Sequence, residues 1–235
     1  MVALISVDQA TSMGIVRNME SRKDLIMKKI TVLFLFLLVL SACTASINET
    51  VYVQDGEVRD KDINSINGGI IIGENCKVYG HCRAVNGTIK VGRNSLVSGL
   101  QSVNGQIKVE ENGMVKGNIL AVNGRITLAK GVQINGDVST VNGDIQLDQA
   151  KVAKNIETVN GDIYVQNGSL VEGNIKIKGK SKGMGDKRRI DVYLTEGSQV
   201  TGNIETDDET ISVKVYVSGE SKILGDVINA EIIYQ

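Results

Sequence analysis

Residues 141–147 read VNGDIQL, and related segments recur along the chain at a nearly constant interval. In each segment Val or Ile precedes an Asn-Gly pair, and successive asparagines are 18 or 19 residues apart: Asn67, Asn86, Asn104, Asn123, Asn142 and Asn160. A supersecondary unit of this size buries its apolar face only by stacking on neighbouring copies of itself. The repeat therefore predicts a solenoid of stacked β-rungs.

Apolar residues follow each Asn-Gly pair at fixed offsets. The first aliphatic column holds Ile70, Ile89, Ile107, Ile126, Ile145 and Ile163. The second column, two residues further on, holds Ile72, Val91, Val109, Leu128, Leu147 and Val165. A third column, usually followed by x-Gly-Asn/Asp and another aliphatic residue, holds Val78, Val97, Val115, Ile134, Val152 and Val171. Because side chains two residues apart share one face of a strand, each repeat contains about three short strands with inward-facing positions.

Three short strands in 18–19 residues fit one rung of a triangular β-solenoid. We predict an all-β, single-stranded β-solenoid (a triangular β-helix) over residues 51–235, with about eight to nine rungs stacked at roughly 4.8 Å. An imperfect first rung is expected from Val51, Val53, Val58 and Ile63. Asn-Gly is predicted to form a corner, because both residues tolerate positive φ and stacked asparagine side chains can hydrogen-bond along the ladder.

The composition supports this architecture and limits the partners. The 235 residues include 26 glycines but no Trp or Pro, so the core of the rungs must consist mainly of Val, Ile and Leu. Thin rungs with tight corners need little aromatic volume, whereas globular cores usually rely on it. The formal net charge of -1 gives no electrostatic bias toward nucleic acid, and we expect no nucleic-acid partner.

The N-terminal region predicts export and membrane attachment. Residues 27–43 read MKKITVLFLFLLVLSAC, in which two lysines precede an apolar stretch that suits a signal peptide and is short for a transmembrane helix. Residues 40–43, Leu-Ser-Ala-Cys, resemble the lipobox of bacterial lipoproteins, and the resemblance implies cleavage before Cys43 and its lipidation. The predicted order is an upstream extension at 1–26, a signal peptide at 27–42, and the lipidated cysteine with a short linker at 43–50.

Two alternatives remain for this region. Residues 1–26 can be an extended n-region retained on the signal peptide, and the apolar run can be a buried strand or helix. The second alternative leaves the two lysines and the abrupt polar switch at Thr44 unexplained. By the same lipoprotein resemblance, Thr44 in place of the Asp typical of inner-membrane retention favours the outer membrane, facing the periplasm, in a host with two membranes.

A basic, Gly-rich segment at 179–189 interrupts the repeat before the apolar pattern resumes at Ile190. We expect a loop that leaves the solenoid wall. Its cations can contact lipid headgroups or another anionic envelope polymer, and the alternative is a solvated loop without a ligand. The candidate contact residues are Lys180, Lys182, Lys187, Arg188 and Arg189.

Few residues are candidates for catalysis. His81 is the single histidine and falls at a corner, so it is interpreted as a turn residue and not as a general base or zinc ligand. Asp144 and Asp162 are expected to stack one rung apart beside Arg125, where paired carboxylates could act on a polysaccharide, but a solvated corner is the alternative we favour. We therefore expect no catalytic residue, no metal and no cofactor, and a protein that is not an enzyme.

The two other cysteines leave a redox question open. Cys82 belongs to the apolar column of Ile119 and Val138, which indicates a buried side chain. In an oxidising compartment Cys76 and Cys82 can form a disulfide, but the corner between them can hold their Cα atoms more than about 7 Å apart. Buried free thiols are the favoured prediction.

The V-x-Gly-Asn/Asp-Ile/Val corners, at residues 115–119, 134–138 and 171–175, resemble those of bactofilins, polymer-forming bacterial cytoskeletal proteins. The resemblance covers roughly residues 51–227 and implies a nucleotide-independent structural protein that self-associates through its ends. The Val-Asn-Gly-Asp-Ile runs also resemble a family of putative adhesins with repeated β-rungs. We expect a non-catalytic, membrane-anchored envelope scaffold; an adhesin or glycan-binding module is the alternative, and a polysaccharide-active enzyme a further one.

Overall fold

The computed structural model describes residues 46–179 and 188–235. These residues form strands and no helix, so none of them belongs to a helix able to cross a membrane. The predicted extension, the signal peptide and Cys43 lie outside the described residues, as do Lys180, Lys182 and Lys187. What can be compared with the sequence prediction is therefore the solenoid itself.

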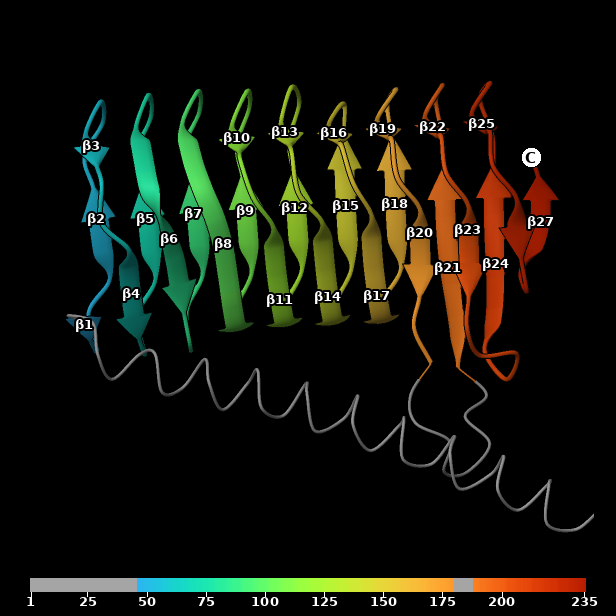
Figure 1. Cartoon of the computed structure of the whole chain (residues 1–235), viewed down its shortest axis with the longest axis horizontal. Helices are drawn as coiled ribbons and strands as arrows, with labels where there is room; N and C mark the ends of the chain where they lie inside the picture. Colours follow the sequence, from blue (N-terminus) through green and yellow to red (C-terminus); the bar gives the residue numbers. More distant parts are fainter. Residues whose placement is uncertain (1–45, 180–187) are drawn as a thin grey trace, which may run out of the picture. The chain divides into compact units, whose positions relative to one another are not determined.

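One wall of the solenoid, called face 1, is a parallel sheet of ten strands. Figure 1 shows them side by side from the blue N-terminal end of the solenoid to the red C-terminal end. Neighbouring strands pair in register, with the isoleucine column in line from Val51 to Ile163. The strands are β2 (Val51–Val53), β5 (Ile70–Ile72), β7 (Ile89–Val91), β9 (Ile107–Val109), β12 (Ile126–Leu128), β15 (Ile145–Asp148), β18 (Ile163–Gln166), β21 (Arg189–Leu194), β24 (Ser212–Val217) and β27 (Glu231–Tyr234).

The other two walls belong to a second parallel sheet of 17 strands, because β6 (Lys77–Ala84) and β8 (Leu96–Asn104) each run through both walls. Face 2 continues with β3 (Val58–Arg59), β10 (Met114–Val115), β13 (Gln133–Ile134), β16 (Lys151–Val152), β19 (Leu170–Val171), β22 (Gln199–Val200) and β25 (Lys222–Ile223). Face 3 continues with β1 (Ser46–Ile47), β4 (Ile63–Ile66), β11 (Ile119–Asn123), β14 (Val138–Asn142), β17 (Ile156–Asn160), β20 (Ile175–Ile177), β23 (Ile204–Thr206) and β26 (Val227–Ile228). The predicted three-walled solenoid is confirmed.

The core lies between the three walls and consists of the predicted columns. All members of the first and third aliphatic columns from Ile70 to Val171 are buried, as are those of the second. Cys82 is buried in line with Ile63 and Leu100, as its column predicted. Alternating burial along each strand gives the period of two that the sequence pattern indicated.

The solenoid has ten rungs, counted on face 1, and not eight to nine. Rungs eight to ten lack the Asn-Gly corner, so the repeat signal fades while strand pairing continues through β21, β24 and β27. The first bridge also begins earlier than predicted, at Ser46, within the segment expected to be a linker. Ten rungs at the usual strand spacing make the solenoid about 48 Å long.

In the imperfect first rung, the aliphatic Val58 faces outward. Val58 pairs with the outward-facing Lys77 and is exposed, whereas Arg59 pairs with the buried Val78. The alternation of a two-residue strand is too short to fix its phase from sequence. A charged residue therefore occupies the inward column at the N-terminal end.

The Asn-Gly corner is explained mainly by close stacking and not by positive φ. Among the six predicted corner asparagines only Asn67 has positive φ. The glycine is required because a Cβ at Gly124 would lie 2.1 Å from the carbonyl oxygen of Gly105 on the rung below. Positive φ recurs instead at the corner after the second face-1 column, at Asn75, Asn94 and Asn112, which the Asn-Gly repeat did not predict.

Candidate functional sites on the faces and ends of the solenoid

The corner asparagines form a continuous hydrogen-bonded ladder on the surface. Each Nδ2 donates to the Oδ1 of the asparagine one rung earlier, over distances of 2.6–3.1 Å from Asn160 back to Asn48. In the interior rungs, each asparagine side-chain amide therefore donates one hydrogen bond and accepts one from the neighbouring asparagines. This arrangement confirms the predicted ladder and assigns the asparagine column a structural role.

The C-terminal end of the ladder meets the basic segment. Arg188 Nη1 donates to Asn160 Oδ1 at 2.6 Å and also to the carbonyl oxygen of Val159. Arg189 contacts Asp191 at 2.9 Å and the hydroxyl of Tyr216 at 2.7 Å. Two of the five candidate anion-contact residues thus lie against the solenoid wall, while the three lysines are outside the described residues. Contact of this segment with an anionic surface stays a prediction.

The predicted carboxylate pair belongs to a longer row. Asp144 accepts from Arg125 at 3.0 Å and from the backbone N–H of Asp162 at 3.2 Å. Asp162 in turn accepts from the backbone N–H of Asp191 at 2.9 Å. Sequence spacing missed Asp191 because the basic segment lengthens that repeat. One oxygen of Asp144 and one of Asp162 thus bind the backbone of the next rung, as corner residues do.

Burial raises the pKa of Asp162, and the carboxylates of Asp191 and Asp144 add to the increase against the backbone hydrogen bond from Asp191. A carboxyl group with a raised pKa can serve as a general acid. Metal ions are a separate question: within the described residues, no group of three or more His, Cys, Asp or Glu side chains could hold one.

Three of the tyrosines stack beside this row, which the sequence analysis did not foresee. Tyr164, Tyr193 and Tyr216 project from consecutive face-1 strands, with ring centroids 5.0 and 4.9 Å apart and nearly parallel planes. The three tyrosines occupy paired positions on adjacent rungs, but their alignment could be predicted only if the register across residues 179–189 were known. The stacked rings cover each other's faces, so the stack presents mainly ring edges and hydroxyl groups outward.

The histidine and the cysteines occupy structural positions. The backbone N–H of His81 donates to Asp62 Oδ1 at 2.8 Å, the same contact that Asp137 makes with Asn118 at another corner. This confirms the interpretation of His81 as a corner residue. Cys76 and Cys82 are buried free thiols, as favoured, and burial raises the pKa of Cys82 to about 12, with Asp62 adding to the shift.

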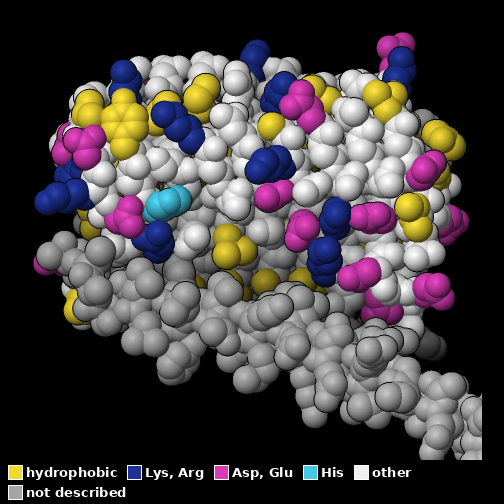
Figure 2. Space-filling view, viewed as in Figure 1, with side chains coloured by type: hydrophobic (Ala, Val, Ile, Leu, Met, Phe, Trp, Pro, Cys, Tyr) yellow, Lys and Arg dark blue, Asp and Glu magenta, His cyan; other side chains and the backbone are white. Residues whose placement is uncertain are grey.

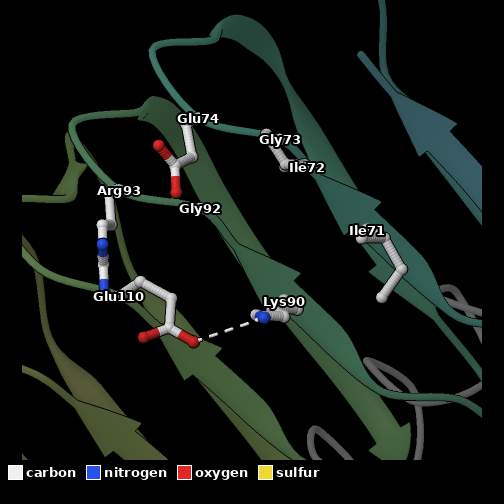
Figure 3. A pocket seen from close by; sticks show the side chains of 8 residues that line it. All are labelled: Ile71, Ile72, Gly73, Glu74, Lys90, Gly92, Arg93 and Glu110. Atoms are coloured by element: carbon white, nitrogen blue, oxygen red, sulfur yellow. Dashed lines mark ion pairs between the residues drawn. The ribbon is translucent and has the colours of Figure 1, made fainter. Parts of the chain in front are cut away.

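A shallow depression of about 310 Å³ lies where face 1 turns into face 2 on rungs two to four. Figure 3 shows Lys90 and Glu110 pointing toward one another across it, 3.5 Å apart, and Glu110 also pairs with Lys108 at 3.0 Å. Burial favours a higher pKa for Glu110, but the hydrogen bonds and charges of the two lysines outweigh it and lower the pKa. Both lysines pair with Glu110, so none of these three groups is left without a partner in the depression.

Glu57 and Arg59 form an ion pair, called the charged clip, at the N-terminal end of the solenoid. Glu57 accepts from the backbone N–H of Gln54 at 2.9 Å and from Arg59 Nε at 2.8 Å. Arg59 Nη2 also donates to the carbonyl oxygen of Tyr52 on the terminal strand β2 at 3.4 Å. The hydrogen bond from Arg59, followed by that from Gln54, lowers the pKa of Glu57. The inward-facing Val53 on the same terminal strand is only 3% exposed.

An apolar collar surrounds the same end, with one residue on each face. Ile47 on face 3, Tyr52 on face 1 and Val58 on face 2 point outward and are 63%, 60% and 58% exposed. Figure 2 shows hydrophobic side chains on the visible surface near both ends of the solenoid, the left-hand, N-terminal end included.

The C-terminal end is open and apolar. In the described residues β25, β26 and β27 each pair with a strand on one side only. Ile232 and Tyr234 continue buried columns of face 1 but are 38% and 77% exposed, because no later rung covers them. Ile223 and Val227 continue the columns of faces 2 and 3 and are half-buried.

No family model, no curated protein and no solved structure matches this chain. The strand pairing of the described residues defines the fold, and the surfaces of the solenoid carry the functional inference.

Proposed function

We propose that this protein is a non-catalytic envelope scaffold, lipid-anchored through Cys43, whose β-solenoid associates with a second copy. The open C-terminal end carries this proposal: a terminal strand edge and exposed core-type side chains coincide there. Such edges pair with other chains unless they are blocked. Attachment to the outer membrane on the periplasmic side follows from the lipoprotein resemblance, and an end-associating scaffold agrees with the bactofilin resemblance.

Sedimentation analysis of the solenoid tests the association. We expect a protein comprising residues 44–235 to form concentration-dependent assemblies, and the exposed-end variant Ile232→Lys/Tyr234→Lys to sediment as a monomer. Both residues are exposed, so the substitutions leave the buried core intact. Val58→Lys, at the opposite end, is the matched control and keeps the association. A wild-type monomer at high concentration contradicts the scaffold proposal.

Lipidation is tested separately. When the full chain is expressed in a diderm bacterium, mass spectrometry is expected to find an acylated N-terminal Cys43 in the membrane fraction. Cys43→Ala is expected to remain unprocessed. An unmodified Cys43 in the wild-type chain excludes the anchor.

Glycan binding is a second candidate, favoured by the tyrosine stack. Hydroxyl groups and edges of Tyr164, Tyr193 and Tyr216 lie beside the charged row of Arg125, Asp144 and Arg189, which could hydrogen-bond a saccharide. Retention on isolated cell-wall glycans that is lost in Tyr193→Ala supports this function, and equal retention of the variant rejects this site.

A polysaccharide-active enzyme remains the least supported candidate. Both carboxylates that it would need, Asp144 and Asp162, bind the backbone of the next rung. Turnover of a polysaccharide that disappears in Asp144→Asn/Asp162→Asn would establish it, whereas unchanged turnover removes these residues from any mechanism.

A further inference from the structure

We propose that the apolar collar of Ile47, Tyr52 and Val58 is a membrane-contact surface that sits in the headgroup region of a zwitterionic bilayer and holds the solenoid upright on it. The inference rests on the proposed lipid anchor at Cys43. It adds a second contact, made by folded rungs, that decides how the anchored solenoid is oriented.

The length of the tether places the collar at the surface. Only residues 44 and 45 separate Cys43 from the first paired strand at Ser46. The three extended steps from Cys43 to Ser46 span at most about 11 Å. A lipid on Cys43 therefore brings the N-terminal rung into the headgroup layer, with Tyr52 and its neighbours at the level where amphipathic rings are favoured.

The direction of the collar side chains argues against a second copy as the occupant. A solenoid stacked on the N-terminal end would cover inward-facing positions and strand edges, as each rung does for its neighbour. Outward-facing side chains stay exposed in such a stack, as Tyr79 does although a rung lies on each side of it. The collar is covered only by a medium that surrounds the end on all three faces, which a lipid headgroup layer does.

The charges around the collar favour a zwitterionic surface. Residues 46–62 contain five acidic and two basic side chains, so the first rung gains no attraction from anionic lipid. The basic segment follows β20 at the end of rung seven, which is about 30 Å from the N-terminal end at the usual rung spacing. In an upright solenoid Arg188 and Arg189, the described cations of this segment, are several Debye lengths, of about 8 Å each, from the bilayer that holds the anchor.

A single-tryptophan experiment tests this orientation without relying on cellular lipidation. The core residues of the described chain lie between Val53 and Val217, so a protein beginning at Cys43 retains the whole core. Its Cys43 thiol can be coupled to a maleimide phospholipid in phosphatidylcholine vesicles, while Cys76 and Cys82 are buried. Because the chain has no Trp, Tyr52→Trp introduces one reporter at the collar, and Tyr234→Trp is the matched control at the other end.

We expect blue-shifted emission and loss of intensity with brominated phosphatidylcholine for Tyr52→Trp, and neither change for Tyr234→Trp. Adding Ile47→Lys/Val58→Lys to Tyr52→Trp is expected to reverse the quenching, which identifies the collar and not the tether as its cause. Quenching that survives these lysines, an unquenched Tyr52→Trp variant, or quenching of both reporters in a solenoid lying flat each overturns the proposal. An unmodified Cys43 in cells would instead reject the anchor and leave these readouts unchanged.

Discussion

The N-terminal end of the solenoid carries a charged residue in an aliphatic column, whereas at the C-terminal end the aliphatic columns of β25, β26 and β27 end in apolar residues. Arg59 binds Glu57 and the carbonyl oxygen of Tyr52 on the terminal strand, and Val53 on the same strand is 3% exposed. At the other end Ile232 and Tyr234 have no cover among the described residues. Although its rungs share one geometry, the solenoid thus has a blocked strand edge at the N-terminal end and an open strand edge at the C-terminal end.

This difference separates two kinds of assembly. A solenoid with two open ends would stack head to tail into a filament, because each copy would offer both complementary surfaces. An inward-pointing charge is a known way of blocking a strand edge. With one end blocked, the proposed association through the C-terminal end would stop at two copies.

The largest expected effect compares the middle of the core with the open end. Ile126→Ala should lower the free energy of unfolding by about 2–5 kcal/mol, because it creates a cavity at a fully buried position. Ile232→Ala, in the same face-1 column, should cost under about 1 kcal/mol because its side chain is already exposed. Urea denaturation followed by circular dichroism measures both, and equal losses would show that the last rung is covered.

Opening the blocked end should change the size of the assembly. Arg59→Val removes the inward charge and its hydrogen bond to Tyr52, so we expect longer, concentration-dependent species. Analytical ultracentrifugation and electron microscopy detect them. Lys61→Val removes a nearby exposed charge and serves as the control. An unchanged sedimentation profile for Arg59→Val would refute the blocking role of the clip.

The ends of the asparagine ladder also differ, since Arg188 covers the C-terminal acceptor on Asn160. Arg188→Ala should lower stability by about 1 kcal/mol through the loss of a charge-assisted hydrogen bond. The neighbouring Arg189→Ala removes an ion pair whose arginine is 56% exposed, so it should lower stability less than Arg188→Ala does. Urea denaturation of the two variants side by side ranks them, and a larger loss for Arg189→Ala reverses the assignment.

The smallest effects concern pH and have opposite signs in the two halves. The pKa of Glu57 is lowered in the folded state, so its contribution is present above the unfolded pKa and is lost as pH falls through the folded pKa. Glu57→Gln should therefore be less stable than wild type at neutral pH, with the difference fading in acid. Thermal unfolding between neutral and acidic pH measures it, and a pH-independent difference would exclude the electrostatic cause.

Asp162 should behave in the opposite way because its pKa is raised. Its contribution is present below the unfolded pKa and is lost as pH rises through the folded pKa. Asp162→Asn keeps an acceptor for the Asp191 N–H and should be more stable than wild type at neutral pH, but not in acid. The same thermal series tests it, and a destabilised variant at neutral pH would mean that the carboxylate is needed in its charged form.

Most of the fold could be predicted because interior rungs repeat the same physical requirements. The columns of Ile126, Leu128 and Ile134 have the right period for buried strands, and the asparagine ladder follows from their stacking. The phase of β3 and the contact of Asp191 with Asp162 could not be predicted. A two-residue strand has too little alternation to set its phase, and residues 179–189 break the register that would have placed Asp191.

The sequence alone determined that this chain forms a three-walled β-solenoid with an aliphatic core, since each rung must satisfy the same packing at the same spacing. Only the tertiary structure decided that its ends are unlike. Whether a side chain is buried at an end depends on what lies beyond it: Arg59 folds over one end, and nothing among the described residues covers Tyr234 at the other. A local repeat carries no information about that difference, because it is a property of the stack.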